Sequence, residues 1–330
     1  MKLACLSCAA IAAFALAGAS PTATSTATVV DTAAAPPAEA AEEIGIAADG
    51  RDRMTVDAMV DGQGPYPFLI DTGAERTVIS SELAQRLDLD EGRGARLHSM
   101  SGVSQVATVV IPELQVSRKP VREIHAPALK RAHIGAAGML GIDSLQSQRV
   151  TFDFGRHKMT IVPSGGWQPD SDPDTIVVTA RTRLGRLVLV DARLDGQKLK
   201  VVLDTGSEVT VGNEALRRKL IAKKRLGETV PIELISVTGG STKADYARVK
   251  RVRIGGMLIN DLPIAFADVH PFRQLGLRDE PAMLLGMDAL RLFDRVSVDF
   301  ATRKVRFTHP DISGLGSPTR MALGRSLPAA

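Results

Sequence analysis

Short runs of apolar and β-branched residues, broken by glycine, proline and aspartate, fill the chain from about residue 45 to residue 309. Such runs are typical of strands joined by turns. Two aspartate-glycine pairs, Asp61-Gly62 and Asp195-Gly196, lie between alternating runs and predict hairpin turns. Helical spacing follows over residues 80–89 and 213–224, behind a serine and an asparagine that suit N-caps. The pattern therefore predicts a mostly β protein with a few helices.

The same pattern is written twice. Residues 56–80 ("VDAMVDGQGPYPFLIDTGAERTVIS") parallel residues 190–213 ("VDARLDGQKLKVVLDTGSEVTVGN"), and residues 138–162 parallel residues 284–307. Between them, "LHSMSGVS" and "LISVTGGS" each resemble a strand, a Ser/Thr-Gly tip and a returning strand. An internal repeat of this length predicts two units of one fold.

The repeat boundaries divide the chain. We expect a signal peptide over 1–19, a disordered leader over 20–44, lobe 1 over 45–165, a linker over 166–173, lobe 2 over 174–309 and a flexible tail over 310–330. A short positive start, an apolar stretch and A-x-A patterns near residue 19 are typical of a secretory signal. The protein is therefore expected to be exported, to the periplasm or beyond; an uncleaved segment would instead tether it to a membrane.

The amino-acid composition limits the partners and cofactors that the protein could bind. Hydrophobic residues make up 44% of the chain, enough for real cores, and the formal charge of +4 is too mild to indicate nucleic acid binding. Both cysteines lie within the first 19 residues, and the six histidines show no metal-ligand spacing. We therefore expect no metal and no organic cofactor.

Each repeat places Asp-Thr-Gly directly after an apolar run, at Asp71 and at Asp204. One such tripeptide is a common turn signal, but two at matching places in a repeat indicate a shared function. A carboxylate at the end of a buried strand is costly unless it is hydrogen-bonded or shares a proton. Two of them face to face would titrate as a pair and supply one general acid and one general base.

These motifs resemble those of retropepsin-like aspartic peptidases, here with two lobes fused in one chain as in bacterial two-lobed aspartyl protease family proteins. The resemblance covers residues 45–309 and rests on D-T-G-A-x-x-T-V-I-S, on D-T-G-S, and on an apolar-apolar-Gly triplet in each lobe. It implies two tandem acid-protease β-barrels related by a pseudo-two-fold axis. It also implies an aspartic endopeptidase that hydrolyses peptide bonds of a polypeptide substrate.

The resemblance also assigns roles. Asp71 and Asp204 would be the catalytic pair that holds a water. The surrounding loop would be completed by Thr72, Gly73, Ala74, Thr205, Gly206 and Ser207. The apolar-apolar-Gly triplets would support these loops through Leu140, Gly141, Leu285 and Gly286. The flap candidates are Ser101, Gly102, Thr238, Gly239 and Gly240, which as ordinary hairpin tips would have no such role.

Ser207 has no counterpart in lobe 1, where Ala74 stands. A hydroxyl there that donates to the neighbouring carboxylate would favour ionised Asp204 and leave Asp71 as the proton carrier.

Other readings stay open. The same fold would also suit a catalytically silent peptide-binding module of the cell envelope, although two intact D-T-G motifs argue against it. A two-carboxylate glycosidase is disfavoured by the scarcity of aromatic residues, at 4%. Because both aspartates come from one chain, we expect a monomer with an internal pseudo-dimer; the alternative is that each half pairs with another chain.

Overall fold

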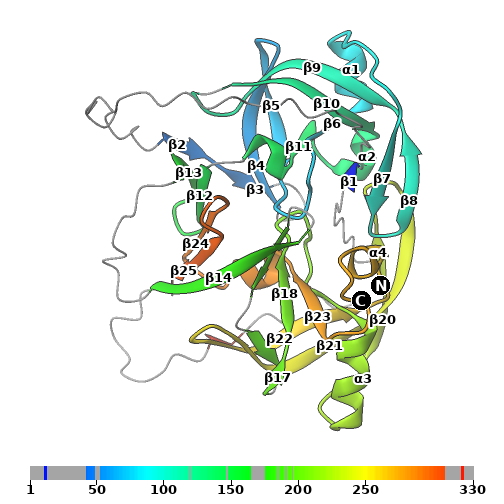
Figure 1. The fold of residues 1–330 in the computed structure, drawn as a ribbon, viewed down its shortest axis with the longest axis vertical. Coiled ribbons are helices and arrows are strands. Elements are labelled where there is room, and N and C mark those ends of the chain that lie inside the picture. The colour runs from blue at the N-terminus through cyan, green and yellow to red at the C-terminus, as the bar shows by residue number, and fades with distance from the viewer. Residues whose placement is uncertain are drawn as a thin grey trace, which may run out of the picture.

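The structure is a computed structural model that describes residues 11–12, 42–48, 53–118, 120–145, 148–164, 175–183, 186–189, 192–194, 196–308 and 321–322. It is 54% strand and 13% helix, which confirms the predicted mostly β fold. Figure 1 shows lobe 1 at the top, lobe 2 at the bottom, and a sheet shared by both lobes at the left. The predicted linker and most of the predicted signal peptide, leader and tail lie outside the described residues.

Lobe 1 is a closed barrel of six strands. Its order is β4 (Met54–Val60), β5 (Gln63–Ile70), β11 (Gly138–Leu140), β6 (Val78–Ser80), β10 (Val121–Leu129) and β9 (Thr108–Gln115), and β9 pairs back with β4. β3 (Ala47–Ala48) adds to its edge. A hairpin of β7 (Ala95–Ser99) and β8 (Gly102–Val106) extends from the barrel, and α1 (Ser81–Arg86), α2 (Arg131–Ile134) and the 3₁₀ turn η1 (Ile142–Ser144) connect the strands.

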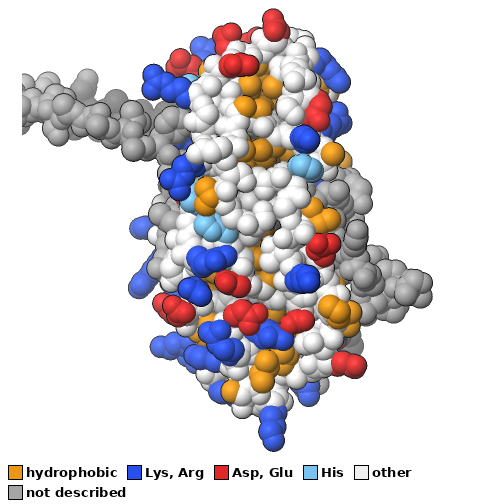
Figure 2. Space-filling model, turned by 90° about the vertical axis from the view of Figure 1, so that its right-hand side faces the viewer, with side chains coloured by type: hydrophobic (Ala, Val, Ile, Leu, Met, Phe, Trp, Pro, Cys, Tyr) orange, Lys and Arg blue, Asp and Glu red, His pale blue; other side chains and the backbone are white. Residues whose placement is uncertain are grey.

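Lobe 2 repeats this arrangement, with β15 (Arg186–Leu189) and β16 (Ala192–Leu194) in the place of β4. The rest of its path comprises β17 (Gln197–Lys198), β18 (Lys200–Leu203), β19 (Val211–Gly212), β21 (Ser241–Ile254), β22 (Met257–Phe266) and β23 (Ala282–Leu285). β20 (Val230–Ile235) pairs with β21 to form its hairpin, and the helices are α3 (Glu214–Ala222), α4 (His270–Gln274) and α5 (Met287–Leu290). In Figure 2, lysine and arginine side chains gather over the lower half of the molecule, where lobe 2 lies.

A six-stranded antiparallel sheet joins the lobes. Its order is β14 (Thr175–Arg183), β25 (Lys304–Thr308), β24 (Arg295–Asp299), β12 (Gln148–Asp153), β13 (Lys158–Pro163) and β2 (Glu42–Gly45). At its centre β12 of lobe 1 pairs with β24 of lobe 2, and Thr151 lies opposite Ser297. The two hydroxyls hydrogen-bond at 2.9 Å. Because Thr151 and Ser297 are equivalent residues of the repeat, the pseudo-two-fold axis passes between them.

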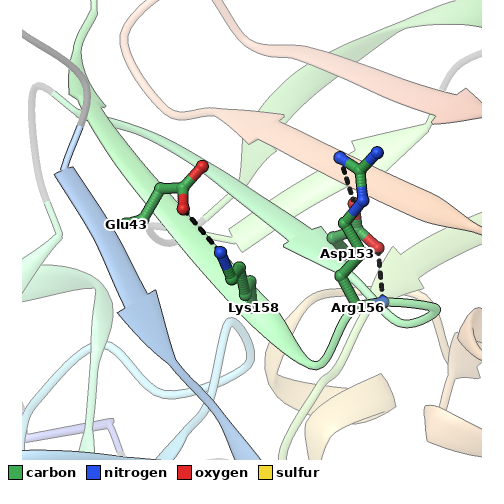
Figure 3. A network of polar contacts seen from close by, with 4 residues as sticks. All are labelled: Glu43, Asp153, Arg156 and Lys158. Atoms are coloured by element: carbon green, nitrogen blue, oxygen red, sulfur yellow. Dashed lines mark hydrogen bonds and ion pairs between the residues drawn. The ribbon is translucent and has the colours of Figure 1, made fainter.

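Strand β2 begins a few residues before the predicted lobe boundary at residue 45. Glu42, Glu43 and Ile44, predicted to belong to the disordered leader, pair with β13 as strand β2. Glu43 forms a salt bridge with Lys158, with 2.7 Å between the carboxylate oxygen and the ammonium nitrogen (Figure 3). The open edge of β13 supplies unpaired backbone groups, and a short segment with one apolar residue is enough to pair with them.

Two further short strands lie in terminal segments. β1 (Ile11–Ala12), within the predicted signal peptide, pairs with β7. β26 (Met321–Ala322), within the predicted tail, pairs with β22.

The two predicted helix N-caps and the predicted turn between β4 and β5 are present in the structure. Leu83 N donates to the Ser80 hydroxyl at 3.2 Å, and Leu216 N donates to Asn213 Oδ1 at 2.9 Å, so both predicted N-caps begin their helices. At the turn between β4 and β5, Asp61 and Gly62 have φ values of 48° and 71°, the left-handed pair that a two-residue hairpin turn needs.

The largest core cluster runs through both barrels and the shared sheet. Five of its phenylalanines are among the largest fully buried side chains: Phe68, Phe152, Phe266, Phe293 and Phe307. The rings of Phe293 and Phe307 pack 4.9 Å apart between centroids. Across the described ranges, none of the helices has the length and apolar character to cross a membrane.

Candidate active site

Each D-T-G loop leaves a central strand of its barrel. β5 runs parallel to β11 and β18 runs parallel to β23, and each aspartate follows three buried residues at the end of its strand. The backbone continues this pairing for one more residue, because Asp71 N donates to Leu140 O at 3.0 Å and Asp204 N donates to Leu285 O at 3.1 Å. The predicted apolar-apolar-Gly triplets thus lie directly beside the aspartates of their own lobes.

The two threonines bind across the pseudo-two-fold axis. Thr72 N donates to Thr205 Oγ1 at 2.9 Å, and Thr205 N donates to Thr72 Oγ1 at 3.2 Å. The Thr205 hydroxyl in turn donates to Ile70 O at 2.8 Å. All these groups are buried, so the bonds fix the two loops relative to each other without competition from solvent.

The two glycines let each loop approach the carboxyl of the other lobe. A Cβ placed on Gly73 would lie 2.9 Å from Asp204 Oδ1 and 3.0 Å from Asp71 Oδ1. A Cβ placed on Gly206 would collide with the carboxyl group of Asp71. The space between the loops therefore holds the two carboxyl groups and excludes any side chain at these two positions.

Burial and mutual repulsion set the protonation of the pair. Asp71 is 0% exposed and Asp204 is 1% exposed. Burial first, and then the negative charge of Asp204, raise the pKa of Asp71 well above its usual range. A bond of 2.7 Å from Gly73 N and the charges of Arg186 and Arg53 act in the opposite direction. Burial and the charge of Asp204 outweigh these effects, so Asp71 keeps its proton to a higher pH than an exposed aspartate would.

Sequence reasoning missed two buried arginines. Arg53 is 1% exposed and Arg186 is 0% exposed, and both lower the pKa of Asp71. Arg53 also donates to Ile134 O at 2.7 Å. The signal was present in the repeat, since each arginine stands 18 residues before the aspartate of its lobe, 53 before 71 and 186 before 204.

The loops rest on a second pair of motifs inside each lobe. A Cβ on Gly141 would collide with the backbone of Arg76, and one on Gly286 would collide with the backbone of Val209. Gly141 N donates to Thr77 Oγ1 and Gly286 N to Thr210 Oγ1, each at 3.2 Å. Each triplet thus packs against the loop that its lobe contributes to the site.

Two half-buried aspartates outside the predicted set hold these threonines. Asp143 accepts from the hydroxyl of Thr77 at 2.8 Å, and Asp288 accepts from that of Thr210 at 2.7 Å. Burial raises the pKa of Asp288 to about 6. The sequence repeat shows an aspartate after each apolar-apolar-Gly triplet. Because aspartate is common in turns, these two positions did not indicate a role in supporting the site.

Ala74 and Ser207 occupy equivalent places at the ends of the D-T-G turns. Their carbonyl groups accept from Ile142 N and Met287 N, each at 2.8 Å. The Ser207 hydroxyl donates to Val209 O at 2.7 Å.

The Ser/Thr-Gly tips of the two hairpins meet. Met100 and Ser101 form the turn of the β7–β8 hairpin, here called flap 1, and Gly102 follows as the first residue of β8. Ser236 to Gly240 form the turn of the β20–β21 hairpin, here called flap 2. The Thr238 hydroxyl lies 3.1 Å from that of Ser99 and 3.3 Å from that of Ser101. A Cβ on Gly240 would lie 2.6 Å from the Ser101 hydroxyl, and Gly239 lies against the ring of His133.

Each flap also inserts an apolar residue into the opposite lobe. Met100 of flap 1 is 2% exposed and packs in a cluster of lobe 2 that includes Phe272 of α4. Val237 of flap 2 is 0% exposed and packs in a cluster of lobe 1 that includes Ile134 of α2. Met100 and Val237 were not predicted, yet they are equivalent residues that directly precede the two tips in the repeat.

Within the part of the chain that the structure describes, no three His, Cys, Asp or Glu side chains gather closely enough to hold a metal ion.

Comparison with protein families agrees with this geometry. Residues 56–147 match the family described as "gag-polyprotein putative aspartyl protease", and residues 190–289 match the family described as "Aspartyl protease". No curated protein matches the chain. One match covers the D-T-G loop and flap of lobe 1, and the other covers those of lobe 2. The chain therefore belongs to the retropepsin-like aspartic proteases, with two aspartyl protease domains in tandem.

Proposed function

We propose that the protein is an aspartic endopeptidase that hydrolyses peptide bonds with a water activated between Asp71 and Asp204. The observation that carries the proposal is the convergence of two buried carboxyl groups from equivalent loops, held by the reciprocal bonds of Thr72 and Thr205. A fold that keeps two like charges this close must bind a proton between them. A shared proton is what acid-base hydrolysis of a carbonyl compound requires.

In this mechanism the ionised carboxylate of Asp204 accepts a proton from the water as its oxygen attacks the carbonyl carbon of the peptide. Protonated Asp71, whose pKa burial raises, donates its proton to the carbonyl oxygen. A tetrahedral diol results. Its breakdown transfers a proton to the leaving nitrogen and restores the pair with one proton.

The substrate is proposed to be an extended polypeptide. Both flaps are antiparallel hairpins, and an extended peptide is the kind of ligand that can pair with the edge of such a hairpin. The flap tips must separate first, because they contact each other and their apolar residues are buried.

The competing function is a peptide-binding module with the same fold and no catalysis. A binding module gains nothing from two buried carboxyl groups, whose desolvation is costly. It would nevertheless bind peptides and leave them intact.

The test is cleavage of an unfolded protein by the full chain from pH 3 to pH 8, with the Asp71→Asn variant beside it. Asp61→Asn, in the exposed turn between β4 and β5, is the matched control. We expect wild type and control to cleave, and Asp71→Asn to lose at least about 1,000-fold in rate. Peptide binding without cleavage by folded wild type at every pH would replace this proposal with the binding module.

We further propose that the protein acts as a monomer outside the cytoplasm, with no metal or organic cofactor. Both aspartates and both flaps come from one chain, and the sequence begins with the features of an export signal.

A further inference from the structure

Two histidines beside the tip of flap 1 take no part in the proposed chemistry. His98 lies on β7, and His270 is the first residue of α4 in lobe 2. We propose that His98 and His270 form an acid-sensitive latch that holds flap 1 closed on lobe 2 at neutral pH and releases it when both rings are protonated. The latch concerns flap movement and does not depend on the proposed catalytic activity.

The contact between the two rings is direct. His98 Nδ1 lies 2.8 Å from His270 Nε2, with ring centroids 5.1 Å apart and the planes tilted by 31°. The backbone adds a second bond, since His270 N donates to Met100 O at 3.1 Å. These bonds cross from one lobe to the other at the point where Met100 enters the apolar cluster of lobe 2. Opening flap 1 therefore requires all three interactions to break.

A hydrogen bond between two ring nitrogens needs a proton on one and a lone pair on the other. Two imidazolium rings have no lone pair to share, so the hydrogen bond requires at least one of the two rings to be neutral. Two positive rings at this distance also repel each other. The second protonation thus converts an attractive contact into a repulsive one.

The surrounding charges make that protonation costly in the closed state. Burial lowers the pKa of both rings, and so do positive neighbours: Arg96 on β7 and Arg186 on β15 for His98, and His98, Arg273 on α4 and Arg186 for His270. The nearby carboxylate of Asp268 forms an ion pair with Arg273 at 3.9 Å. All the charged neighbours that change the pKa of the two rings are positive.

The direction of the pH effect follows. Because each closed-state pKa lies below the ordinary histidine value of 6.5, the closed flap binds fewer protons than the open flap. Closure is fully favoured above that value and weakens as pH falls through and below it. Flap 2 carries Ile235 where flap 1 carries His98, so flap 2 has no counterpart of this histidine pair.

Amide hydrogen exchange of the full chain at pH 7.5 and pH 5.0 tests the latch. The compared variant is His270→Gln, whose amide can still bond to His98 in either protonation state. At pH 5.0 we expect amides of residues 95–106 to exchange at least about fivefold faster in wild type than in His270→Gln. At pH 7.5 the two should agree. Comparison at the same pH cancels the intrinsic pH dependence of exchange.

His125→Gln, an exposed histidine on β10, is the matched control and should behave as wild type. The barrel amides of β9 and β10 should exchange equally in wild type and in each variant at a given pH. If His270→Gln fails to fold, His98→Gln serves the same purpose. Equal exchange of flap 1 in wild type and His270→Gln at pH 5.0 would overturn the latch. Since Asp71→Asn should show the same exchange as wild type, loss of catalysis leaves the result readable.

Discussion

At the residue scale, the site depends on groups that are small or buried as much as on the carboxyl groups themselves. Gly73 and Gly206 have no side chain, and this is why two loops can bring Asp71 and Asp204 together. Burial then shifts the protonation of Asp71 in the direction that an acid-base pair requires.

The variant Gly206→Ala tests the close approach. Its Cβ would collide with the Asp71 carboxyl, so the loop or the aspartate must move. We expect a loss of at least about 100-fold in kcat/KM while the protein stays folded, measured by peptide cleavage and circular dichroism. Gly227→Ala is the control, because a Cβ there meets nothing within 4 Å. Full activity of Gly206→Ala would contradict the geometry described here.

The raised pKa of Asp288 predicts that the free energy of unfolding changes with pH. Burial raises its pKa from 3.8 to about 6, so the folded state holds this proton more tightly than the unfolded chain does. The stabilisation is complete below pH 3.8 and is lost as pH rises through about 6. The shift corresponds to about 3 kcal/mol in the free energy of unfolding.

Chemical unfolding of wild type and Asp288→Asn at pH 4.5 and pH 7.5 measures this term. Wild type should lose stability relative to the variant as pH rises. An identical pH dependence in the two proteins would show that Asp288 does not titrate as its burial requires.

At the scale of elements, the two flaps bind to each other and to the opposite lobes. Each hairpin carries a hydroxyl-rich tip that contacts the other tip, and an apolar residue that packs into the opposite lobe. α2 and α4, which follow equivalent strands, contribute to the two clusters that receive Val237 and Met100. The two flaps are therefore held in place by contacts between the lobes.

A disulfide between the two tips tests whether the proposed entry of substrate requires the flaps to separate. The hydroxyls of Ser101 and Thr238 lie 3.3 Å apart, so cysteines at both positions are within reach of a bond after a small shift of two loop tips. In a chain with Cys5→Ser and Cys8→Ser, we expect oxidised Ser101→Cys/Thr238→Cys to lose cleavage of a protein substrate. Reduction should restore it. Each single cysteine variant is a control, and unchanged cleavage by the cross-linked protein would mean that substrates enter without flap separation.

At the scale of the whole molecule, the shared sheet fixes the lobes in the orientation that the site needs. β12 and β24 pair in register about Thr151 and Ser297, and Arg149 and Asp153 lie opposite Asp299 and Arg295. The pseudo-two-fold axis through this sheet also relates Thr72 to Thr205. One chain thus supplies both halves of the site.

Mixing two inactive variants tests whether one chain is sufficient. If both aspartates act within one molecule, a mixture of Asp71→Asn and Asp204→Asn remains as inactive as either variant alone. If halves of different chains pair, the mixture contains sites with two intact aspartates and recovers activity. Peptide cleavage after joint refolding measures this, with refolded wild type as the positive control.

Much of this was determined by the sequence alone. The duplicated pattern of strands and turns predicted two β lobes, because alternating apolar residues can bury only one face of a strand. The tripeptides at Asp71 and Asp204 predicted the paired loops. Ser80 and Asn213 predicted the helix starts, since capping is a local interaction. These features share one property: the residues that decide them are near neighbours in the chain.

The tertiary structure decided what depends on contacts between distant segments. The burial of Arg53 and Arg186 beside Asp71, the exchange of Met100 and Val237 between lobes, and the contact of His98 with His270 join segments that the repeat pattern leaves apart. Strand β2 formed where the sequence predicted a leader, because the open edge of β13 supplied its partner. The local sequence pattern specifies each lobe. The electrostatic field around the aspartates and the contacts between the flaps arise only when the two lobes pack together.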